Sequence, residues 1–139
     1  MNPGGAVHVL VGLIGDPLGR WLVNQRRPGT HLAGAWEFPG GKLKPGESRF
    51  AALRRELHEE IGIELVAADA LLEIVHDYPD KRVRLDVWRV LEYRGVVTAR
   101  EGQRLDWVEL DALEALPLLA ADLPIIAALR ERGVSAAGA

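Results

Sequence analysis

The sequence predicts an α/β protein in which a mixed β-sheet is sandwiched between helices, and three features support that fold class. Residues 6–14 (AVHVLVGLI) form a nearly continuous apolar run, which is typical of a strand buried on both faces. Residues 47–61 change to a helical periodicity, and further strand-like segments follow. Strands on both sides of one central helix, with another helix near the end, favour layered α/β packing over a helix bundle.

The first part of the chain alternates strands with segments rich in Gly and Pro. A turn at residues 15–20 (GDPLGR) is expected to reverse the chain, so that a strand at residues 21–26 forms a hairpin with the first strand. Segments 27–35 and 39–46 are predicted to be loops. The glycines and prolines of the second loop are expected to exclude regular structure there.

Residues 47–61 are predicted to form the central helix. Apolar side chains recur at three- and four-residue spacing and give one buried stripe, formed by Phe50, Leu53, Leu57 and Ile61. Gly62 follows at the position where a left-handed residue commonly ends a helix. The helix is therefore expected to pack on the sheet by one face.

The second part of the chain continues the sheet and ends in a helix. The expected elements are strands at 70–76, 82–91 and 104–110, a helical turn at 111–116, and a closing helix within 121–132. Asp122 is expected to be the N-cap of that helix. Residues 1–133 are predicted to form one domain, and residues 134–139 a disordered tail.

Composition restricts the classes of function. The chain has 139 residues, a formal net charge of −3 and no cysteine. Without cysteine, a bound metal must be held by oxygen or imidazole ligands, and oxygen ligands favour Mg²⁺, Mn²⁺ or Ca²⁺. The charge gives no basic field for a nucleic-acid polymer, and no apolar run is long enough to span a membrane. A cytoplasmic protein is expected.

Three carboxylates are crowded onto one side of the predicted helix. At about 100° per residue, Glu56, Glu59 and Glu60 share an arc of about 100° that borders the apolar stripe. Like charges at this spacing repel each other, whereas a divalent cation would reverse the sign of the interaction. Arg55 lies four residues before Glu59 and can pair with it. Taken alone, such a cluster is also compatible with a solvated acidic surface.

The residues around this cluster resemble the Nudix box. From Gly41 the sequence is G-KLKPG-E-SRFAALR-R-E-L-H-E-E-I-G-I, which is similar to the box at every specified position: G, five residues, E, seven residues, R-E-apolar-x-E-E-x-G-apolar. The flanking segments WEFPGGK, DYPDK, EGQ and ADLPIIAAL are similar to the MutT branch of that family, the 8-oxo-dGTP diphosphatases. The resemblance implies an α/β/α sandwich with a catalytic loop-helix-loop motif.

The resemblance also implies an activity and a metal site. Such enzymes hydrolyse a nucleoside triphosphate to the monophosphate and pyrophosphate with Mg²⁺, and Mn²⁺ is the alternative ion. The matching metal ligands are Glu56, Glu59, Glu60, Glu101 and the carbonyl of Gly40. Glu56 is favoured as the general base by analogy, although another of these carboxylates could serve. Arg55 and Glu47 are expected to orient and brace the site.

By the same resemblance, the triphosphate lies near Arg26 and His31. The expected substrate-binding residues are Arg26, His31, Phe38, Gly40, Gly41, Asp80, Lys81 and Asp122. Each also has a structural alternative, such as a surface cation or a core aromatic. Asp122 departs from the MutT pattern, which has asparagine there. An ionised Asp only accepts hydrogen bonds, so Asp122 could accept from the base, be protonated, or only cap the helix.

Three functions remain open on the residues alone. The leading one is hydrolysis of 8-oxo-dGTP and 8-oxo-GTP. The second is pyrophosphate release from another nucleotide, such as CTP, because the box binds metal and diphosphate but does not recognise the base. The third is an inactive nucleotide-binding module. The expected partner is a small nucleotide, with no nucleic-acid polymer or membrane, and the expected state is a monomer or weak homodimer.

Overall fold

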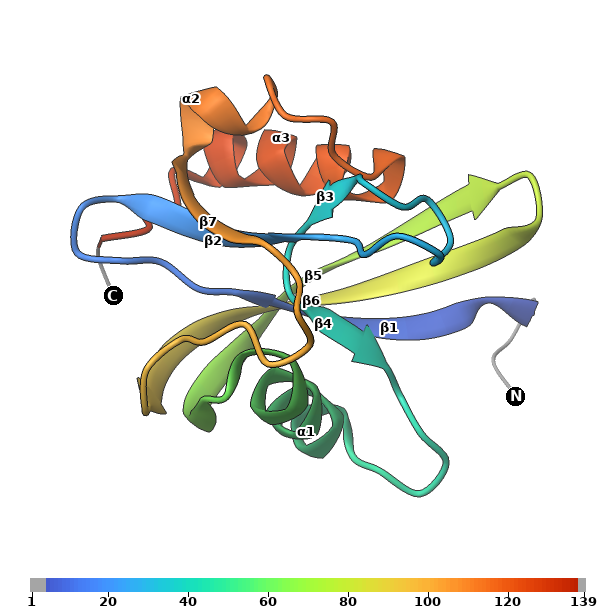
Figure 1. Cartoon of the computed structure of the whole chain (residues 1–139), viewed down its shortest axis with the longest axis horizontal. Coiled ribbons are helices and arrows are strands. Elements are labelled where there is room, and N and C mark those ends of the chain that lie inside the picture. The colour runs from blue at the N-terminus through green and yellow to red at the C-terminus, as the bar shows by residue number, and fades with distance from the viewer. Residues whose placement is uncertain (1–4, 138–139) are drawn as a thin grey trace.

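A four-stranded mixed sheet runs through the middle of the fold, with strand order β4-β1-β6-β5 (Figure 1). β1 (Val7–Leu13) pairs in parallel with β6 (Lys81–Arg94) and antiparallel with β4 (Gly40–Lys42). β5 (Glu64–Tyr78) pairs antiparallel with β6. The structure is a computed structural model that describes residues 5–137. The predicted mixed sheet is confirmed.

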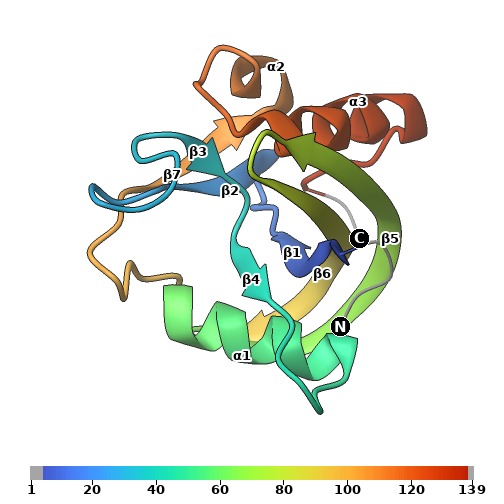
Figure 2. The same ribbon diagram turned by 90° about the vertical axis from the view of Figure 1, so that its right-hand side faces the viewer.

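A second, three-stranded sheet packs over the first. Its central strand is β2 (Arg20–Gln25), which pairs antiparallel with β3 (Trp36–Glu37) and with β7 (Leu105–Glu109). The remaining elements are α1 (Arg49–Ile61), α2 (Leu110–Leu113), the 3₁₀ turn η2 (Ala120–Asp122) and α3 (Leu123–Arg132). α1 covers one face of the four-stranded sheet and α3 lies on the opposite side of the molecule, whereas the second sheet contributes side chains to the core beside each helix (Figure 2).

The sheet separates two apolar cores. The core on the α1 side includes Leu10, Leu53, Leu57 and Ile61, which are fully buried. The core on the other side joins both sheets to α3 and includes Trp21, Val87 and Ile125. Full burial of a Leu or Ile side chain contributes about 1.5–3 kcal/mol. The buried stripe of α1 therefore holds this helix firmly against the sheet.

Local signals set both ends of α1. The Ser48 hydroxyl accepts a hydrogen bond from the Ala51 backbone N–H at 3.1 Å, which satisfies one of the free donors of the first turn. Gly62 ends the helix with a φ of 72°, a conformation that favours glycine. The predicted apolar stripe and the predicted cap are both confirmed.

An ion pair between the half-exposed Arg49 and the buried Asp86 fixes the start of α1 on the sheet. The Arg49 guanidinium donates to both carboxylate oxygens of Asp86 at 2.6 and 2.7 Å. Asp86 is 1% exposed and also contacts His8 and the indole N–H of Trp88, each at 2.8 Å. Burial opposes ionisation of Asp86, but these hydrogen bonds lower its pKa overall. The N-terminal end of α1 is thereby held to β6.

The predicted hairpin of the first two strands is wrong. β1 and β2 belong to different sheets, and one isolated antiparallel bridge, between Gly15 and Trp21, closes the base of the turn between them. Both edges of β1 are already used, one by β4 and the other by β6. The Asp16 carboxylate accepts from the backbone N–H groups of Leu18 and Arg20, which closes the turn locally. The two strands then diverge into separate sheets.

The prediction of irregular structure throughout residues 39–46 is also wrong. Gly40–Lys42 forms β4, with Gly40 opposite Val11 on β1. Pairing with β1 satisfies the backbone groups of this segment, and that partner is distant in sequence. β5 and β6 extend beyond the predicted strands at both ends. β3 was not predicted.

The end of the described chain lies against the core. The Arg89 guanidinium donates to the carbonyl of Ser135 at 2.7 Å, and Ala136 is 8% exposed. Residues 138 and 139 lie outside the described part, so the domain boundary at 133 stays a prediction. None of the helices within residues 5–137 has the length and apolar character needed to cross a membrane.

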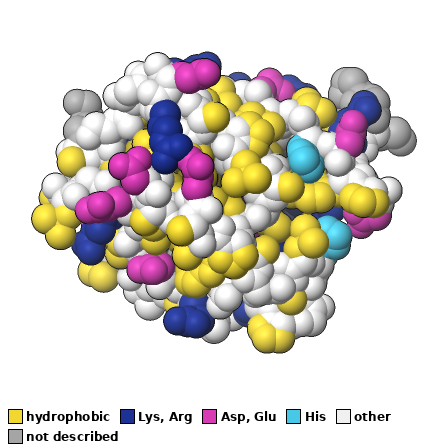
Figure 3. All heavy atoms as spheres, turned by 90° about the horizontal axis from the view of Figure 1, so that it is seen from above, with side chains coloured by type: hydrophobic (Ala, Val, Ile, Leu, Met, Phe, Trp, Pro, Cys, Tyr) yellow, Lys and Arg dark blue, Asp and Glu magenta, His cyan; other side chains and the backbone are white. Residues whose placement is uncertain are grey.

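The face over α2 and α3 carries scattered charges among hydrophobic side chains (Figure 3). Arg130 of α3 contacts Asp111 at 3.2 Å and also pairs with Glu114. Exposed ion pairs of this kind contribute about 1 kcal/mol or less to stability. Leu123, at 47% exposed, lies at the start of α3.

Candidate active site

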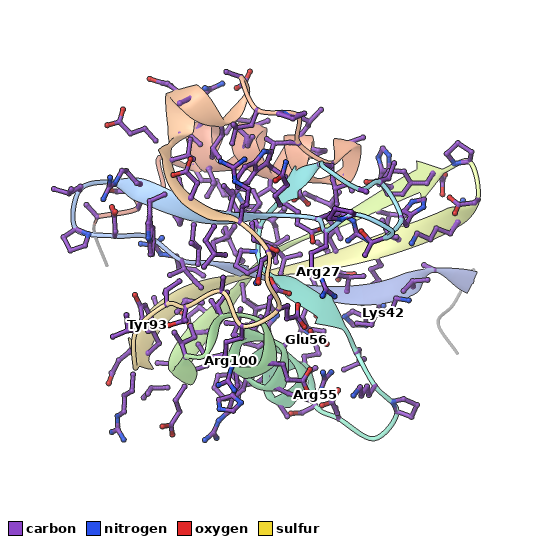
Figure 4. All side chains as sticks on the ribbon, in the orientation of Figure 1. Arg27, Lys42, Arg55, Glu56, Tyr93 and Arg100 are labelled. Carbon is purple, nitrogen blue, oxygen red and sulfur yellow. The ribbon has the colours of Figure 1, made fainter. Side chains whose placement is uncertain are left out.

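α1 presents the three predicted carboxylates to different environments. The Glu60 residue is 8% exposed, whereas the side chains of Glu56 and Glu59 are 18% and 50% exposed. Glu56 lies between α1 and β4, with Arg55 beside it (Figure 4). Glu59 lines an open groove on the outer side of the helix instead. The acidic cluster therefore extends from the protein interior to its surface.

Arg55 connects the carboxylates of the predicted motif. It donates to the two oxygens of Glu47 at 2.6 and 2.9 Å and to Glu56 at 2.7 Å. It also reaches Glu59 at 3.4 Å and the carbonyl of Lys42 at 3.0 Å. The hydrogen bonds from Arg55 lower the pKa of Glu47 to about 2, and Glu47 in turn raises the pKa of Arg55. The expected bracing contacts of Arg55 and Glu47 are present.

The two glycines before the motif allow close approach between β4 and its neighbours. Gly40 has a φ of 155°, and a Cβ there would overlap with the Leu10 carbonyl oxygen. A Cβ on Gly41 would overlap with the Glu56 carboxylate. Glycine at both positions lets the strand backbone approach β1 on one side and a carboxylate of α1 on the other.

Burial and mutual repulsion make the inner carboxylates hard to ionise. Burial is the main cause that raises the pKa of Glu60 well above its ordinary value, and the charges of Glu37, Glu101 and Glu56 add to it. A backbone hydrogen bond from Gly40 opposes that shift. Burial also raises the pKa of Glu56 against the effect of Arg55. A cation at this position would relieve both penalties.

Glu60 carries a buried carboxyl oxygen that lacks a hydrogen-bond partner within the described part of the chain. Its Oε1 atom is buried without a hydrogen-bond partner among residues 5–137. An unpaired buried oxygen of this kind costs free energy unless a group supplies the missing contact. Within the same residues, no three carboxylate or imidazole side chains are grouped closely enough to hold one metal ion. The predicted metal site of five ligands stays a prediction.

A small cavity of about 170 Å³ opens between Glu60 and the later loop. Glu101, the predicted loop ligand, lines it together with Gly40 and Arg26. Arg27 donates to the carbonyl of Glu101 at 3.0 Å, so the loop between β2 and β3 contacts the loop between β6 and β7. The structure thus brings Glu60, Glu101 and Gly40 to one cavity.

A larger cavity of about 310 Å³ adjoins the first one, because Gly40 lines both. Seven of the eight predicted substrate-binding residues line it, namely Arg26, His31, Phe38, Gly40, Gly41, Lys81 and Asp122. Asp80 is not among the lining residues, but its carboxylate lies 3.9 Å from the His31 ring at the mouth. Residues far apart in the sequence, from the loop after β2 to η2, therefore form one pocket.

Asp122 has a different contact from the one expected. Asp122 is the N-cap residue of α3, as predicted, but its side chain makes no capping hydrogen bond to the helix. Its Oδ2 accepts a hydrogen bond from the Phe38 backbone N–H at 3.0 Å, and the residue is 3% exposed. Burial raises the pKa of Asp122 to about 8, with a smaller contribution from Glu37. The carboxyl is therefore largely protonated at neutral pH and is a hydrogen-bond donor as well as an acceptor.

Glu37 was missed by the sequence reasoning, although it lies within the quoted WEFPGGK segment. It lines both cavities, and Arg26 contacts its two carboxylate oxygens at 3.3 Å. Burial raises the pKa of Glu37 and Arg26 opposes that shift. Arg26 is held further by its hydrogen bond to the His31 carbonyl at 2.5 Å. The predicted phosphate-binding cation is thus held between a carboxylate and a loop.

Two further residues of the site were not predicted. Tyr78 lines the larger cavity, and its hydroxyl accepts from the Ala121 N–H at 3.1 Å beside Asp122. Gln103 lines the smaller cavity and is 7% exposed. The only sequence signal for either was adjacency to a predicted residue, since Tyr78 is in DYPDK and Gln103 is in EGQ.

Known proteins share both the sequence pattern and the fold. The 8-oxo-dGTP diphosphatase of Proteus vulgaris is 38% identical over 96 residues, which are 69% of this chain and 86% of that protein. The CTP pyrophosphohydrolase of Escherichia coli (strain K12) is 36% identical over 110 residues, which are 79% and 82%. A solved MutT structure, from a study of Aliivibrio salmonicida and Vibrio cholerae, matches with a TM-score of 0.78 at 30% identity and covers 91% of this chain and 98% of that one.

The family comparison covers the whole candidate site. The NUDIX domain family model matches residues 10–128, from within β1 to within α3. That range contains α1 with its carboxylates, the Glu101 loop and Asp122. The box resemblance, the α/β architecture and the match over most of the chain agree, and this chain belongs to the NUDIX domain family.

Proposed function

We propose that this chain is a nucleoside triphosphate pyrophosphohydrolase of the MutT type, which hydrolyses 8-oxo-dGTP and 8-oxo-GTP to the monophosphate and pyrophosphate. The observation that carries the proposal is the pair of adjoining cavities. Both are lined by Arg26, Glu37 and Gly40, and one is lined by apolar and hydrogen-bonding groups while the other contains Glu60 and Glu101. This arrangement suits a nucleotide with its base in the first cavity and its phosphates toward the second.

The residues fit a divalent cation. The candidate ligands all supply oxygen, and the Oε1 atom of Glu60 is buried without a hydrogen-bond partner among residues 5–137, so it is available to a cation. Mg²⁺, or Mn²⁺ as the alternative, would be held by Glu56, Glu60, Glu101 and the Gly40 carbonyl, and Glu59 would join these ligands by turning from the outer groove that it lines. Such an ion neutralises phosphate charge and lowers the pKa of bound water.

The chain's own groups have distinct roles in hydrolysis. We assign Glu56 as the general base that takes the proton of the attacking water, because its carboxylate lies against Gly41 beside the other candidate ligands. As water oxygen bonds to phosphorus, a bridging P–O bond breaks and pyrophosphate leaves. Arg55 holds Glu56 in place at 2.7 Å, and Arg26 lies where it can contact the phosphates.

Asp122 is the group that we assign to base recognition. As a protonated acid it keeps one oxygen on the Phe38 N–H and can donate from the other into the larger cavity. That pattern matches the asparagine of the MutT type. CTP stays the second candidate substrate, because this chain is also similar to a CTP pyrophosphohydrolase.

The reaction is tested by identifying the products. Purified protein with 8-oxo-dGTP and Mg²⁺ is expected to release 8-oxo-dGMP and pyrophosphate in equal amounts, and the Glu56→Gln variant to be at least about 10²-fold slower with an unchanged circular dichroism spectrum. Release of orthophosphate, or no turnover with any nucleoside triphosphate, would contradict the proposal. The second result would favour an inactive binding module. A cytoplasmic location and a monomeric or weakly dimeric state stay predictions.

A further inference from the structure

The Gln103 side chain joins two parts of the candidate metal site. Its Nε2 donates to the backbone carbonyl of Glu60 at 2.8 Å, and its Oε1 accepts from the backbone N–H of Glu101 at 3.0 Å. Gln103 is 7% exposed, so water competes little for either hydrogen bond. One buried amide thus connects the helix ligand to the loop ligand through their backbones.

The contact lies at the end of α1, where helix carbonyls lack partners within the helix. The Glu60 carbonyl also accepts from the Arg100 N–H at 3.2 Å, and the Ile61 carbonyl accepts from the Thr98 N–H at 2.9 Å. The loop between β6 and β7 therefore satisfies two of the free carbonyls of the last turn. Of the three groups that donate to these carbonyls, only the Gln103 amide belongs to a side chain. The same side chain also accepts from the Glu101 N–H.

The segment Glu101–Gly102–Gln103 has a backbone conformation that lets the Gln103 side chain reach the Glu101 N–H. Gly102 has a φ of 74°, so the chain turns between Glu101 and Gln103 in a conformation that favours glycine. Arg27 donates to the Glu101 carbonyl at 3.0 Å, which fixes the other backbone group of Glu101. Both polar backbone groups of Glu101 are thus fixed by hydrogen bonds. Glu101 lies outside the helices and strands, so no regular backbone structure orients its carboxylate.

We propose that Gln103 is a positioning residue that holds Glu101 in register with Glu60, so that both carboxylates are presented to one cation. The inference rests on the proposed function, because it assigns a purpose to Gln103 only if Glu101 and Glu60 are ligands. Residues that orient metal ligands typically change metal affinity or activity by about 10- to 100-fold when they are replaced.

The test uses the full chain with Gln103→Met, which keeps the volume and removes both hydrogen bonds. Without any metal, amide hydrogen exchange measured by NMR is expected to speed up at Glu101. With Mn²⁺ as the probe and no nucleotide, calorimetry is expected to give a dissociation constant about 10- to 100-fold higher than that of the wild type. The kcat is expected to fall with little change in the KM for nucleotide, since the base cavity is untouched.

Two further variants separate positioning from general stability. Thr98→Val is the matched control, because it removes one hydroxyl contact to the Val96 carbonyl in the same loop and keeps the N–H that caps α1. It is expected to bind Mn²⁺ like the wild type. Gln103→Glu keeps an acceptor for the Glu101 N–H but loses the donor to Glu60, and it serves if the Met variant does not fold. It is expected to weaken Mn²⁺ binding while the Glu101 amide stays protected.

A double-mutant comparison tests whether Gln103 acts through Glu101. Adding Gln103→Met to Glu101→Gln is expected to change Mn²⁺ affinity by no more than about a factor of two beyond Glu101→Gln alone. Additive losses, or wild-type Mn²⁺ affinity in Gln103→Met, would overturn the positioning role. If the wild type turns over no nucleotide but Gln103→Met still binds Mn²⁺ more weakly than the wild type, the proposed function is overturned and the positioning role stands. Failure of the wild type to bind Mn²⁺ would overturn both.

Discussion

Asp122 shows how burial changes the chemistry of one side chain. Its carboxyl is enclosed at the base of the larger cavity, where the Phe38 N–H is a donor to it and where Glu37 repels its charge. Arg26 attracts that charge more weakly, and the Tyr78 hydroxyl accepts a hydrogen bond from the adjacent Ala121 N–H. Desolvation outweighs the favourable contacts, so the neutral acid is the stable form in the folded protein.

This residue predicts a pH dependence of stability that Asp122→Asn removes. The pKa of Asp122 is about 8 in the folded protein and 3.8 as its ordinary value, so the folded state binds the proton more tightly. The contribution of protonated Asp122 to the free energy of unfolding is fully present below about pH 4 and is lost as the pH rises through about 8. Each unit of difference between the two pKa values corresponds to about 1.4 kcal/mol. The melting temperature of Asp122→Asn, relative to the wild type, is therefore expected to rise from pH 5 to pH 9.

Thermal denaturation monitored by circular dichroism across that range measures the difference. Asn is the suitable replacement because its carbonyl oxygen still accepts from the Phe38 N–H and its amide supplies the donor. A constant difference between the two proteins at every pH would show that Asp122 ionises normally. The residue type was evident from the sequence, but its contact with Phe38 was not, because 84 positions separate the two residues.

At the scale of elements, the site depends on how closely β4 and α1 approach each other. The helix was predictable because its signals are local: an apolar stripe, a serine at the N-cap and Gly62 at the end. β4 was not predictable, because Gly and Pro usually break strands and its pairing partner β1 lies about thirty positions earlier, at Val9–Val11. The missed strand is the element that places Gly41 against Glu56.

Gly41→Ala tests that approach. Gly41 does not need a left-handed backbone, so alanine is compatible with its conformation, but the new Cβ would overlap with the Glu56 carboxylate. A flexible carboxylate can move away at small cost, so we expect the melting temperature to change little. The displaced base is expected to lower kcat by about 10²-fold, because a shift of about 1 Å in a catalytic group has an effect of that size.

The assay compares kcat for pyrophosphate release with thermal melting in the same preparations. Gly19→Ala is not a suitable control, since Gly19 has a φ of 81° and alanine would be strained there. Ala51→Ser is suitable, because Ala51 is exposed on α1 and the substitution keeps the backbone N–H that donates to the Ser48 hydroxyl. Full activity in Gly41→Ala would show that the Glu56 position is not critical.

At the scale of the whole molecule, two sheets and two cavities define the site. Composition and strand order predicted a mixed α/β fold, and the family pattern predicted which acids matter. Neither predicted that β1 and β2 would separate into two sheets, because strand pairing is decided by contacts between distant segments. That separation allows the loop after β2 to reach both cavities, where Arg26 lines each of them.

The choice of substrate is the central claim and is tested directly by kcat/KM for 8-oxo-dGTP, dGTP and CTP, measured with Mg²⁺ at one pH by pyrophosphate release. We expect the value for 8-oxo-dGTP to exceed the other two by at least about tenfold, which corresponds to about 1.4 kcal/mol of preferential transition-state binding. A value for dGTP or CTP equal to or above that for 8-oxo-dGTP would contradict the assignment, while leaving pyrophosphohydrolase chemistry in place.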